Sequence, residues 1–461
     1  MARCSIHQFL TLMSVSHSSL ASRTAPVPVP DHRAQVNELR PGDRAAHDWY
    51  RFVLSFPPHL VRQYVQGFGL DERHCVLDPF CGTGTTLVEC KKLGIRSVGV
   101  EANPMASFAS YVKTDWSVDP SELTSRANSI ADQVSAHLSR QGIGDDPALR
   151  LADGEEVQFR TLPAEEMALL LTDSISPLPL HKALVLRDAL ERDRQAPYFR
   201  HARLAFARAL VQSISNLHFG PEVGVGKPKF DAPVVASWLN IVYALADDLR
   251  LLGSQRSCPA TVYHADARAL ESVLEPASVD AVITSPPYPN EKDYTRTTRL
   301  ESVLLGFIRN RDELRALKQG LLRSNTRGVY KIDSDDRWIA HHVEISRIAD
   351  QIEARRLELG KTSGFERLYA RVTRLYFGGM ARHLASLRPY LRPGARLAYV
   401  VGDQASYLRV MIRTGQLLAD IATHLGYRVM SIDLFRTRLA TATREQLREE
   451  VVCLLWPGDR G

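Results

Sequence analysis

Residues 75–86 read Cys75-Val76-Leu77-Asp78-Pro79-Phe80-Cys81-Gly82-Thr83-Gly84-Thr85-Thr86, a short apolar run that enters a glycine-containing turn. A helix is predicted after the turn, over residues 85–93, and Gly94 follows at a position where helices commonly end. A second apolar run, residues 97–100, ends at Glu101. Strand, helix and strand in this order form a β-α-β unit, so the sequence predicts a parallel sheet covered by helices.

The acid at the end of the second strand indicates a nucleoside ligand. Glu101 follows the turn by about 20 residues, where a carboxylate can accept hydrogen bonds from ribose hydroxyls. The turn holds Gly82 and Gly84, but Leu87 stands where a dinucleotide fingerprint has its third glycine. S-adenosylmethionine has no phosphates and does not need that glycine, so the pattern favours an adenosine cofactor of this kind. A plain strand-to-helix turn is the alternative interpretation of the two glycines.

A second stretch with chemical content is Ile283-Thr284-Ser285-Pro286-Pro287-Tyr288, which ends another predicted strand, residues 279–283. Proline offers a carbonyl but no N–H. This corner therefore presents the Ser285 hydroxyl, the Pro286 carbonyl and the Tyr288 ring. The exocyclic amine of a nucleic-acid base can donate hydrogen bonds to the two oxygens while the base stacks on the tyrosine. The alternative is a turn that only ends a buried strand.

These polar groups share one location in the predicted sheet. Residues 261–266 form a further strand that ends at Asp266. Three later strands are expected over residues 396–401, 429–434 and 449–456. The carboxyl ends of the strands, where doubly wound sheets bind their ligands, carry Gly82, Glu101, Asp266 and Ser285. The sequence thus predicts a doubly wound α/β fold with a seven-stranded sheet and its site at this edge.

The chain divides into four predicted segments. Alternating prolines near the start favour an extended lead-in over residues 1–46. The sheet domain is expected in two parts, residues 47–116 and 259–461, separated by a helical insertion, residues 117–258. The insertion is predicted to contain helices over residues 121–138, 197–217 and 234–252.

Charge and cysteine usage limit the classes of partner. No apolar run approaches the ~18 residues that a membrane helix needs, so no membrane partner is expected. The six cysteines form no Cys-x-x-Cys pair and no zinc-finger spacing, so we expect reduced thiols, no metal and a cytoplasmic location. The net charge of +6 is matched by residues 292–331, which hold ten Lys or Arg, four Asp or Glu and interleaved aromatics. This segment is the candidate DNA-contacting region, and a plain solvated helix face is the alternative.

Two motifs resemble those of the DNA amino-methyltransferases, the N4-cytosine and N6-adenine class. Residues 78–86 are similar to the cofactor motif of that family, and residues 284–288 resemble its catalytic motif, in the serine form associated with N4-cytosine enzymes. Phe56-Pro57-Pro58 resembles the segment that closes over the methionine part of the cofactor. The resemblance covers about residues 47–116 and 260–456, and it implies a Rossmann-like methyltransferase sheet.

Two departures from the family pattern leave the target base open. Many serine-form members carry the catalytic motif before the cofactor motif, whereas this chain has the reverse order. The helical block at residues 117–258 also separates the two motifs. Since adenine N6 has similar amine chemistry, N6-adenine methylation stays an alternative to N4-cytosine methylation.

The resemblance implies both a cofactor site and a catalytic site. S-adenosylmethionine is expected to bind to Phe56, Pro57, Asp78, Phe80, Cys81, Gly82, Thr83, Gly84, Glu101 and Asp266. Catalysis is expected from Ser285, Pro286, Pro287 and Tyr288. The expected activity is methyl transfer to an exocyclic amine of DNA, with cytosine N4 preferred, and a cognate restriction endonuclease is a candidate partner.

Other classes of function compete with this interpretation. One is an RNA methyltransferase that acts on an exocyclic amine, and another is a nucleic-acid-binding module that has lost catalysis. The intact Ser285 and the Gly82-Thr83-Gly84 turn argue against loss of catalysis. A dinucleotide oxidoreductase is disfavoured by the missing third glycine.

Overall fold

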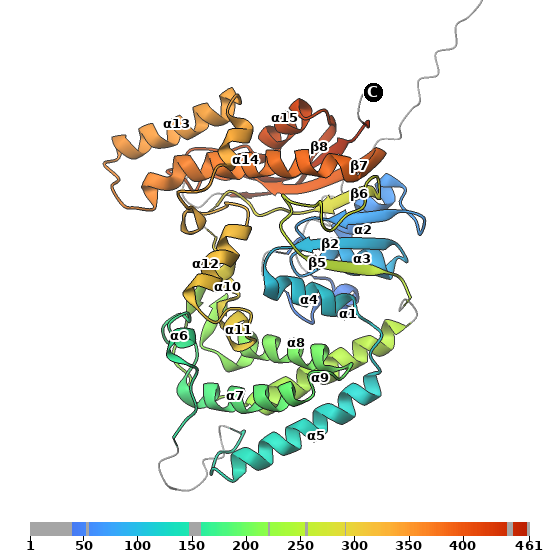
Figure 1. The fold of residues 1–461 in the computed structure, drawn as a ribbon, viewed down its shortest axis with the longest axis vertical. Helices are drawn as coiled ribbons and strands as arrows, with labels where there is room; N and C mark the ends of the chain where they lie inside the picture. Colours follow the sequence, from blue (N-terminus) through green and yellow to red (C-terminus); the bar gives the residue numbers. More distant parts are fainter. Residues whose placement is uncertain are drawn as a thin grey trace, which may run out of the picture.

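The structure is a computed structural model. It describes residues 39–51, 55–146, 158–219, 222–253, 257–290, 292–439 and 446–458. A seven-stranded sheet forms its centre, with the strand order β5-β2-β1-β6-β7-β9-β8 (Figure 1). The strands are β1 (Cys75–Asp78), β2 (Arg96–Glu101), β5 (Ala260–His264), β6 (Val279–Thr284), β7 (Leu391–Gly402), β8 (Arg428–Leu439) and β9 (Gln446–Leu455). Neighbours from β5 to β7 run parallel, and β9 runs antiparallel to both β7 and β8. The predicted seven-stranded α/β sheet is confirmed.

Helices cover both faces of this sheet, which explains why all four residues of the central strand β1 are buried. Alternate residues of β1 point to opposite faces: Val76 packs against α2 and α3, and Leu77 packs in the cluster that holds α13, α14 and α15. These helices are α2 (Pro58–Phe68), α3 (Thr85–Lys92), α13 (Val343–Glu358), α14 (Tyr369–Leu387) and α15 (Thr414–His424). α4 (Pro104–Thr114) follows β2 and packs beside α3.

A helical lobe lies between α4 and β5 in the chain and has its own apolar core (Figure 1). It contains α5 (Pro120–Ser139), α6 (Ala164–Met167), α7 (Pro177–Arg192), α8 (Phe199–Ala209), α9 (Val234–Leu251) and a hairpin of β3 (Leu217–Phe219) and β4 (Val223–Val225). The same core includes Met105 of α4 and Leu300 of a later helix, α11 (Arg299–Leu304). The lobe is therefore fastened to the sheet domain from two distant parts of the chain.

Two details of the lobe differ from the sequence prediction. No helix was predicted over residues 177–192, where α7 lies; its prolines 177 and 179 both lie in the first turn, where proline is tolerated. The helix predicted over residues 197–217 ends earlier, at Ile214, after one π-helical turn. Asn216 then holds the chain extended, since its side-chain amide donates to the Asp173 carbonyl at 2.8 Å.

The residues before α2 are tied to both domains. The predicted lead-in, residues 1–46, lies outside the described residues up to residue 38. Further on, the buried Trp49 donates its indole N–H to Asp248 of α9 at 2.8 Å. His47 is hydrogen-bonded to Glu89 of α3 at 2.8 Å. This segment therefore links α9 of the helical lobe to α3 of the sheet domain.

Within the described residues, no helix is long and apolar enough to cross a membrane. The same part of the chain holds no group of three or more His, Cys, Asp or Glu side chains arranged to bind a metal ion.

Candidate active site

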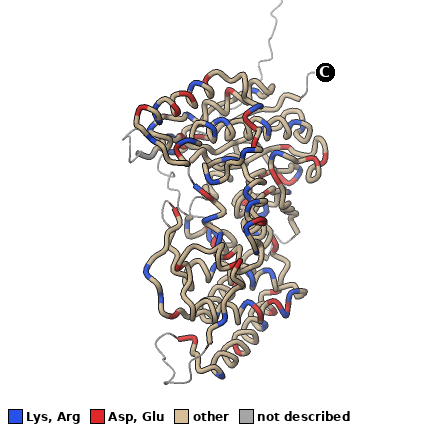
Figure 2. The backbone as a smooth tube through the Cα atoms, turned by 60° about the vertical axis from the view of Figure 1, so that its left-hand side comes forward, with Lys and Arg blue, Asp and Glu red and all other residues tan. Residues whose placement is uncertain are grey.

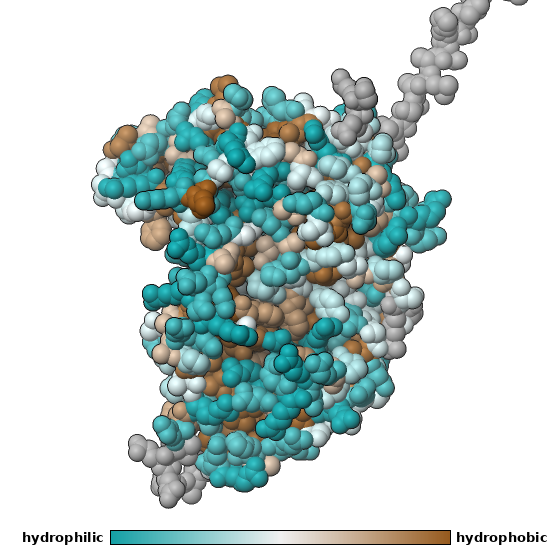
Figure 3. Space-filling model, in the orientation of Figure 1, coloured by the Kyte–Doolittle hydropathy of each residue, from teal (hydrophilic) through white to brown (hydrophobic). Residues whose placement is uncertain are grey.

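A cavity of about 230 Å³ lies at the carboxyl ends of the parallel strands. It is lined by most of the predicted site residues: Phe56, Phe80, Cys81, Gly82, Thr83, Glu101, Asp266, Ser285, Pro286, Pro287 and Tyr288. Pro57, Asp78 and Gly84 are not among the lining residues. Apolar side chains are visible in the hollowed centre of one face, between the sheet and the helical lobe (Figure 3). The fold thus brings the predicted cofactor turn and the predicted catalytic corner, about 200 residues apart in sequence, into one cavity.

Glycine is required at positions 82 and 84 of the turn for different structural reasons. Gly82 has φ of +51°, in the left-handed region that favours glycine, and it lines the cavity. Gly84 has φ of +85°, and a Cβ there would lie 2.6 Å from Ser110 Oγ of α4. Gly84 therefore permits the start of α3 to approach α4, which is a packing role and not a wall of the cavity.

Asp78 connects the predicted cofactor turn to the predicted catalytic corner through hydrogen bonds of its buried carboxylate. Its carboxylate accepts a hydrogen bond from Thr284 Oγ1 at 2.6 Å and another from the Phe80 N–H at 3.2 Å. Burial raises the pKa of Asp78 to about 6. Because Thr284 precedes Ser285 in the chain, this bond fixes the ends of β1 and β6 relative to each other.

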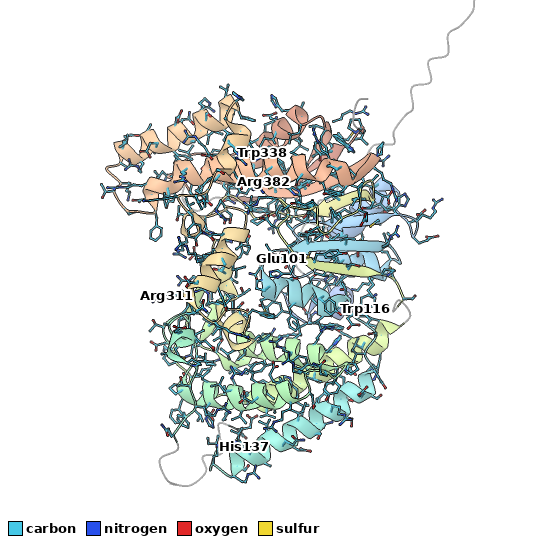
Figure 4. The ribbon with its side chains drawn as sticks, in the orientation of Figure 1. Glu101, Trp116, His137, Arg311, Trp338 and Arg382 are labelled. Atoms are coloured by element: carbon cyan, nitrogen blue, oxygen red, sulfur yellow. The ribbon has the colours of Figure 1, made fainter. Side chains whose placement is uncertain are left out.

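Glu101 presents a carboxylate to the cavity. Its Oε2 accepts from the Gly82 N–H at 2.9 Å, and its Oε1 accepts from the Asn103 N–H at 2.7 Å. Figure 4 shows Glu101 at the carboxyl end of β2, on the side that faces α10 (Tyr294–Thr297). Burial raises the pKa of Glu101 to about 7. Each carboxylate oxygen keeps a lone pair with which it can accept a hydrogen bond from a ligand hydroxyl.

Asp266 is held by an arginine that the sequence analysis missed. Nε and Nη2 of Arg268 donate to the Asp266 carboxylate at 3.0 and 2.7 Å, and Nη1 donates to Asp335 at 2.5 Å. Asp335 also pairs with Arg382, at 3.1 Å; Figure 4 labels Arg382 on α14. The fork geometry of arginine fixes Asp266 at the cavity wall. The Asp-x-Arg spacing at 266–268 was the only sequence signal for this pair.

The Phe80 ring packs against the ring of His383, which is neutral. The two rings meet edge to face, with centroids 4.9 Å apart. His383 is buried; one ring nitrogen contacts the Ala267 carbonyl at 2.7 Å and the other contacts the Tyr399 hydroxyl at 2.7 Å. Burial lowers the pKa of His383 to about 4, so it donates to the carbonyl and accepts from the hydroxyl. Nothing in the sequence connected His383 to this site.

At the catalytic corner, the Ser285 hydroxyl donates to the Val400 carbonyl of β7 at 3.2 Å. Its proton is thereby bound to β7, and the oxygen lone pairs stay available as acceptors. The Tyr288 ring packs against Gly402, where a Cβ would lie 2.8 Å from Tyr288 Cε2. Burial raises the pKa of Tyr288, so its hydroxyl stays neutral.

The basic segment, residues 292–331, divides into two groups of side chains. Some of its basic side chains form ion pairs within the protein. Lys318 pairs with Asp293 at 2.9 Å, and the buried Arg323 pairs with Asp333 at 2.8 Å. Others are exposed and form no ion pair within the described residues: Arg309, Arg311, Arg315, Arg327 and Lys331. The first group stabilises the segment, and the second remains available to a polyanion.

Comparisons with known proteins find similarity to DNA methyltransferases. A family described as DNA methylase matches residues 31–108, which include the cofactor turn. The Type II methyltransferase M.BsoBI of Geobacillus stearothermophilus is 25% identical over 429 residues, which cover 87% of this chain and 82% of that protein. The Type II methyltransferase M.AvaI of Anabaena variabilis is 24% identical over 453 residues, covering 89% of this chain and 84% of that protein.

A shorter match agrees with both. The Type II methyltransferase M.MjaII of Methanocaldococcus jannaschii is 34% identical over 68 residues, which cover 14% of this chain and 12% of that protein. The strand order, the shared cavity and these relatives confirm the resemblance read from the two motifs. These similarities support placing the chain with the DNA amino-methyltransferases.

Proposed function

We propose that this chain transfers a methyl group from S-adenosylmethionine to the N4 amine of cytosine in DNA. The observation that carries the proposal is the Ser285 hydroxyl, which lies in one cavity with the Glu101 carboxylate and has its own proton bound to Val400. Ser285, the proposed acceptor for an amine, and Glu101, the proposed acceptor for a ribose, thus line the same cavity.

The cavity wall fits an adenosine cofactor without phosphates. The carboxylates of Glu101 and Asp266 can accept hydrogen bonds from ribose hydroxyls and from the adenine amine, and the Phe80 ring offers an apolar surface for the base. When bound, S-adenosylmethionine supplies an activated methyl group on its sulfonium.

The residues of the corner would make the target amine reactive. The lone pair of a base amine is delocalised into its ring, which makes the nitrogen a poor nucleophile. If Ser285 Oγ and the Pro286 carbonyl each accept one amine hydrogen, the nitrogen is favoured in a pyramidal form with a usable lone pair. Tyr288 would hold the base by stacking, after the base has left the duplex. Because serine is a poor base, the amine proton is expected to leave after transfer, and positioning supplies much of the rate.

The exposed arginines of residues 292–331 are candidates for DNA contact. α12 (Arg311–Gly320) carries Arg311 and Arg315 one helical turn apart, and Arg315 lies over the Tyr330 ring at 5.5 Å. Figure 4 labels Arg311 on α12. Lys and Arg are mixed with Asp and Glu along the described part of the chain (Figure 2), so the proposal depends on these particular side chains and not on a uniformly basic surface.

Removing two of these arginines tests the DNA contact. Arg311→Ala with Arg315→Ala should weaken DNA binding and reduce the slope of log K against log salt by about 1.8, since each phosphate contact contributes about 0.9. Fluorescence anisotropy with labelled duplex over a salt series measures this slope. Arg428→Ala, an exposed arginine of β8, is the matched control. An unchanged slope in the double variant would exclude α12 from the DNA interface.

The pKa of Glu101 predicts how cofactor binding depends on pH. The ionised carboxylate is the stronger acceptor, so affinity should rise as pH increases through about 7 and then level off. At pH 6 the ionised fraction, and hence the affinity, should be about tenfold lower than at pH 8. Calorimetric titration with S-adenosylmethionine measures this. Glu101→Gln should bind more weakly with little pH dependence; a wild-type profile in that variant would show that the ribose is held elsewhere.

Sequencing of modified bases in DNA from cells that express the protein tests the reaction itself. We expect N4-methylcytosine at one short sequence, and none in cells that express the Ser285→Ala variant. N6-methyladenine at that sequence would overturn the cytosine assignment and leave the amine chemistry in place. A restriction endonuclease specific for the same sequence is the candidate partner.

A further inference from the structure

A change of strand register in β8 places Arg436 at the wall of the cavity. In the pairing of β8 with β9, Leu434 lies opposite Glu450 and Arg436 lies opposite Glu449, so Phe435 is one extra residue in β8. Such bulges bend a strand and redirect side chains, and they are common beside active sites. Phe435 is buried against the core of α2, and Phe435, Arg436 and Glu449 all line the cavity.

Glu449 holds the arginine by one edge. It accepts a hydrogen bond from Nε of Arg436, and the two side chains are 28% and 10% exposed. Within the described residues, this is the one hydrogen bond of the Arg436 guanidinium. The terminal Nη1 and Nη2 groups therefore keep their N–H donors, in the planar arrangement of a fork.

The ion pair lies beside the ring that is expected to stack on the base. A Cβ on Gly402 would lie 2.8 Å from the Tyr288 ring and 3.4 Å from Glu449 Cγ, so both side chains border this one glycine. The β7 carbonyl that binds Ser285, at Val400, is two residues earlier in the same strand. A base held at Ser285 and Tyr288 would therefore present its edge toward Arg436.

We infer that Arg436 is a base-reading residue that selects cytosine, with Glu449 as its positioning residue. This inference rests on the proposed function. Beside its N4 amine, cytosine carries two adjacent acceptors, N3 and O2, which match two parallel N–H donors of a guanidinium. Beside its N6 amine, adenine carries the N1 acceptor and then a C–H group. A fork therefore pairs fully with cytosine and only half with adenine.

The test compares methylation of two duplexes that contain the site found by sequencing, one with the target cytosine and one with adenine in its place. Single-turnover rates are measured for the wild type, Arg436→Met, Arg436→Lys and the control Arg428→Met. Arg436→Met should lower the cytosine rate by about 5- to 150-fold, the discrimination usual for a bidentate contact, and should lower the adenine rate by less, because adenine pairs with only half of the fork. Arg436→Lys keeps the charge without the fork and should lose most of the preference. Arg428→Met should behave as wild type.

Glu449 is tested by a double-mutant cycle. If it acts only by holding Arg436, Glu449→Gln should lower the cytosine preference less than Arg436→Met, and it should add little in the Arg436→Met background. A loss that adds fully in the double variant would overturn the positioning role.

The outcomes separate this inference from the proposed function. A wild-type preference for adenine would show, before any variant is made, that the proposed function is wrong. A cytosine preference that survives unchanged in Arg436→Met, with intact cofactor affinity, would overturn the inference alone. If Arg436→Met lowers the melting temperature, Arg436→Lys decides: a wild-type preference in that variant overturns the inference.

Discussion

Ser285→Ala should lower the rate of methyl transfer by about 100- to 1,000-fold, with cofactor affinity unchanged. The hydroxyl oxygen is the proposed acceptor for one amine hydrogen, and its proton is bound to the Val400 carbonyl. Loss of one preorganised hydrogen bond at a reacting group commonly costs this much. The alanine variant leaves the backbone, the Pro286 carbonyl and the Tyr288 ring in place, so the binding of cofactor and DNA should persist.

Transfer of a labelled methyl group in a single turnover measures this loss, and calorimetry measures cofactor affinity. Ser278→Ala is the matched control, because Ser278 lies just before β6, at the end of that strand opposite to the cavity. Wild-type turnover in Ser285→Ala would remove Ser285 from the mechanism. A parallel loss of cofactor affinity would show that the residue supports the fold of the site and not its chemistry.

Gly378→Ala should lower the free energy of unfolding by about 3 kcal/mol, at the upper end of the usual cost of overpacking. Gly378 lies in α14, where the 3₁₀ turn η6 (Asp335–Ile339) crosses it. A Cβ there would lie 2.1 Å from the Asp335 carbonyl oxygen and 2.8 Å from the Asp336 nitrogen. These are backbone atoms, so the turn itself would have to move. Cofactor affinity should also fall, because Asp335 holds Arg268, which fixes Asp266.

Urea denaturation measures this change in stability. Gly364→Ala is the control, since nothing lies within 4 Å of a Cβ at that position, and its stability should stay within about 0.5 kcal/mol of wild type. Equal stabilities of Gly378→Ala and wild type would mean that η6 does not rest on α14 as described.

The sheet could be predicted from the sequence because its signals are local. Apolar runs that end in acids or in glycine turns predicted the strands, and doubly wound folds bind ligands at those ends. The same logic placed Gly82, Glu101 and Ser285 near one another, and the structure brings them into one cavity. α7 was missed because its leading prolines resemble a loop, although proline is equally at home in the first turn of a helix.

The rest of the site depends on contacts that no local pattern encodes. Asp78 belongs to the motif, yet its carboxylate is bound to Thr284 beneath the cavity, since a sequence does not say where a side chain points. Arg436 reaches the cavity through a register change between β8 and β9. Charge counting likewise could not separate Arg323, which pairs internally, from the exposed Arg311.

The place of β9 in the sheet has a consequence for synthesis on the ribosome. β9 follows β8 in the chain but lies between β7 and β8, so β8 has no hydrogen-bonded neighbour until residues 446–455 have emerged. An unpaired strand can join other chains in the meantime. The cavity wall that carries Arg436 and Glu449 is therefore completed only after β9 has emerged, so the proposed base-reading pair depends on a late step of folding.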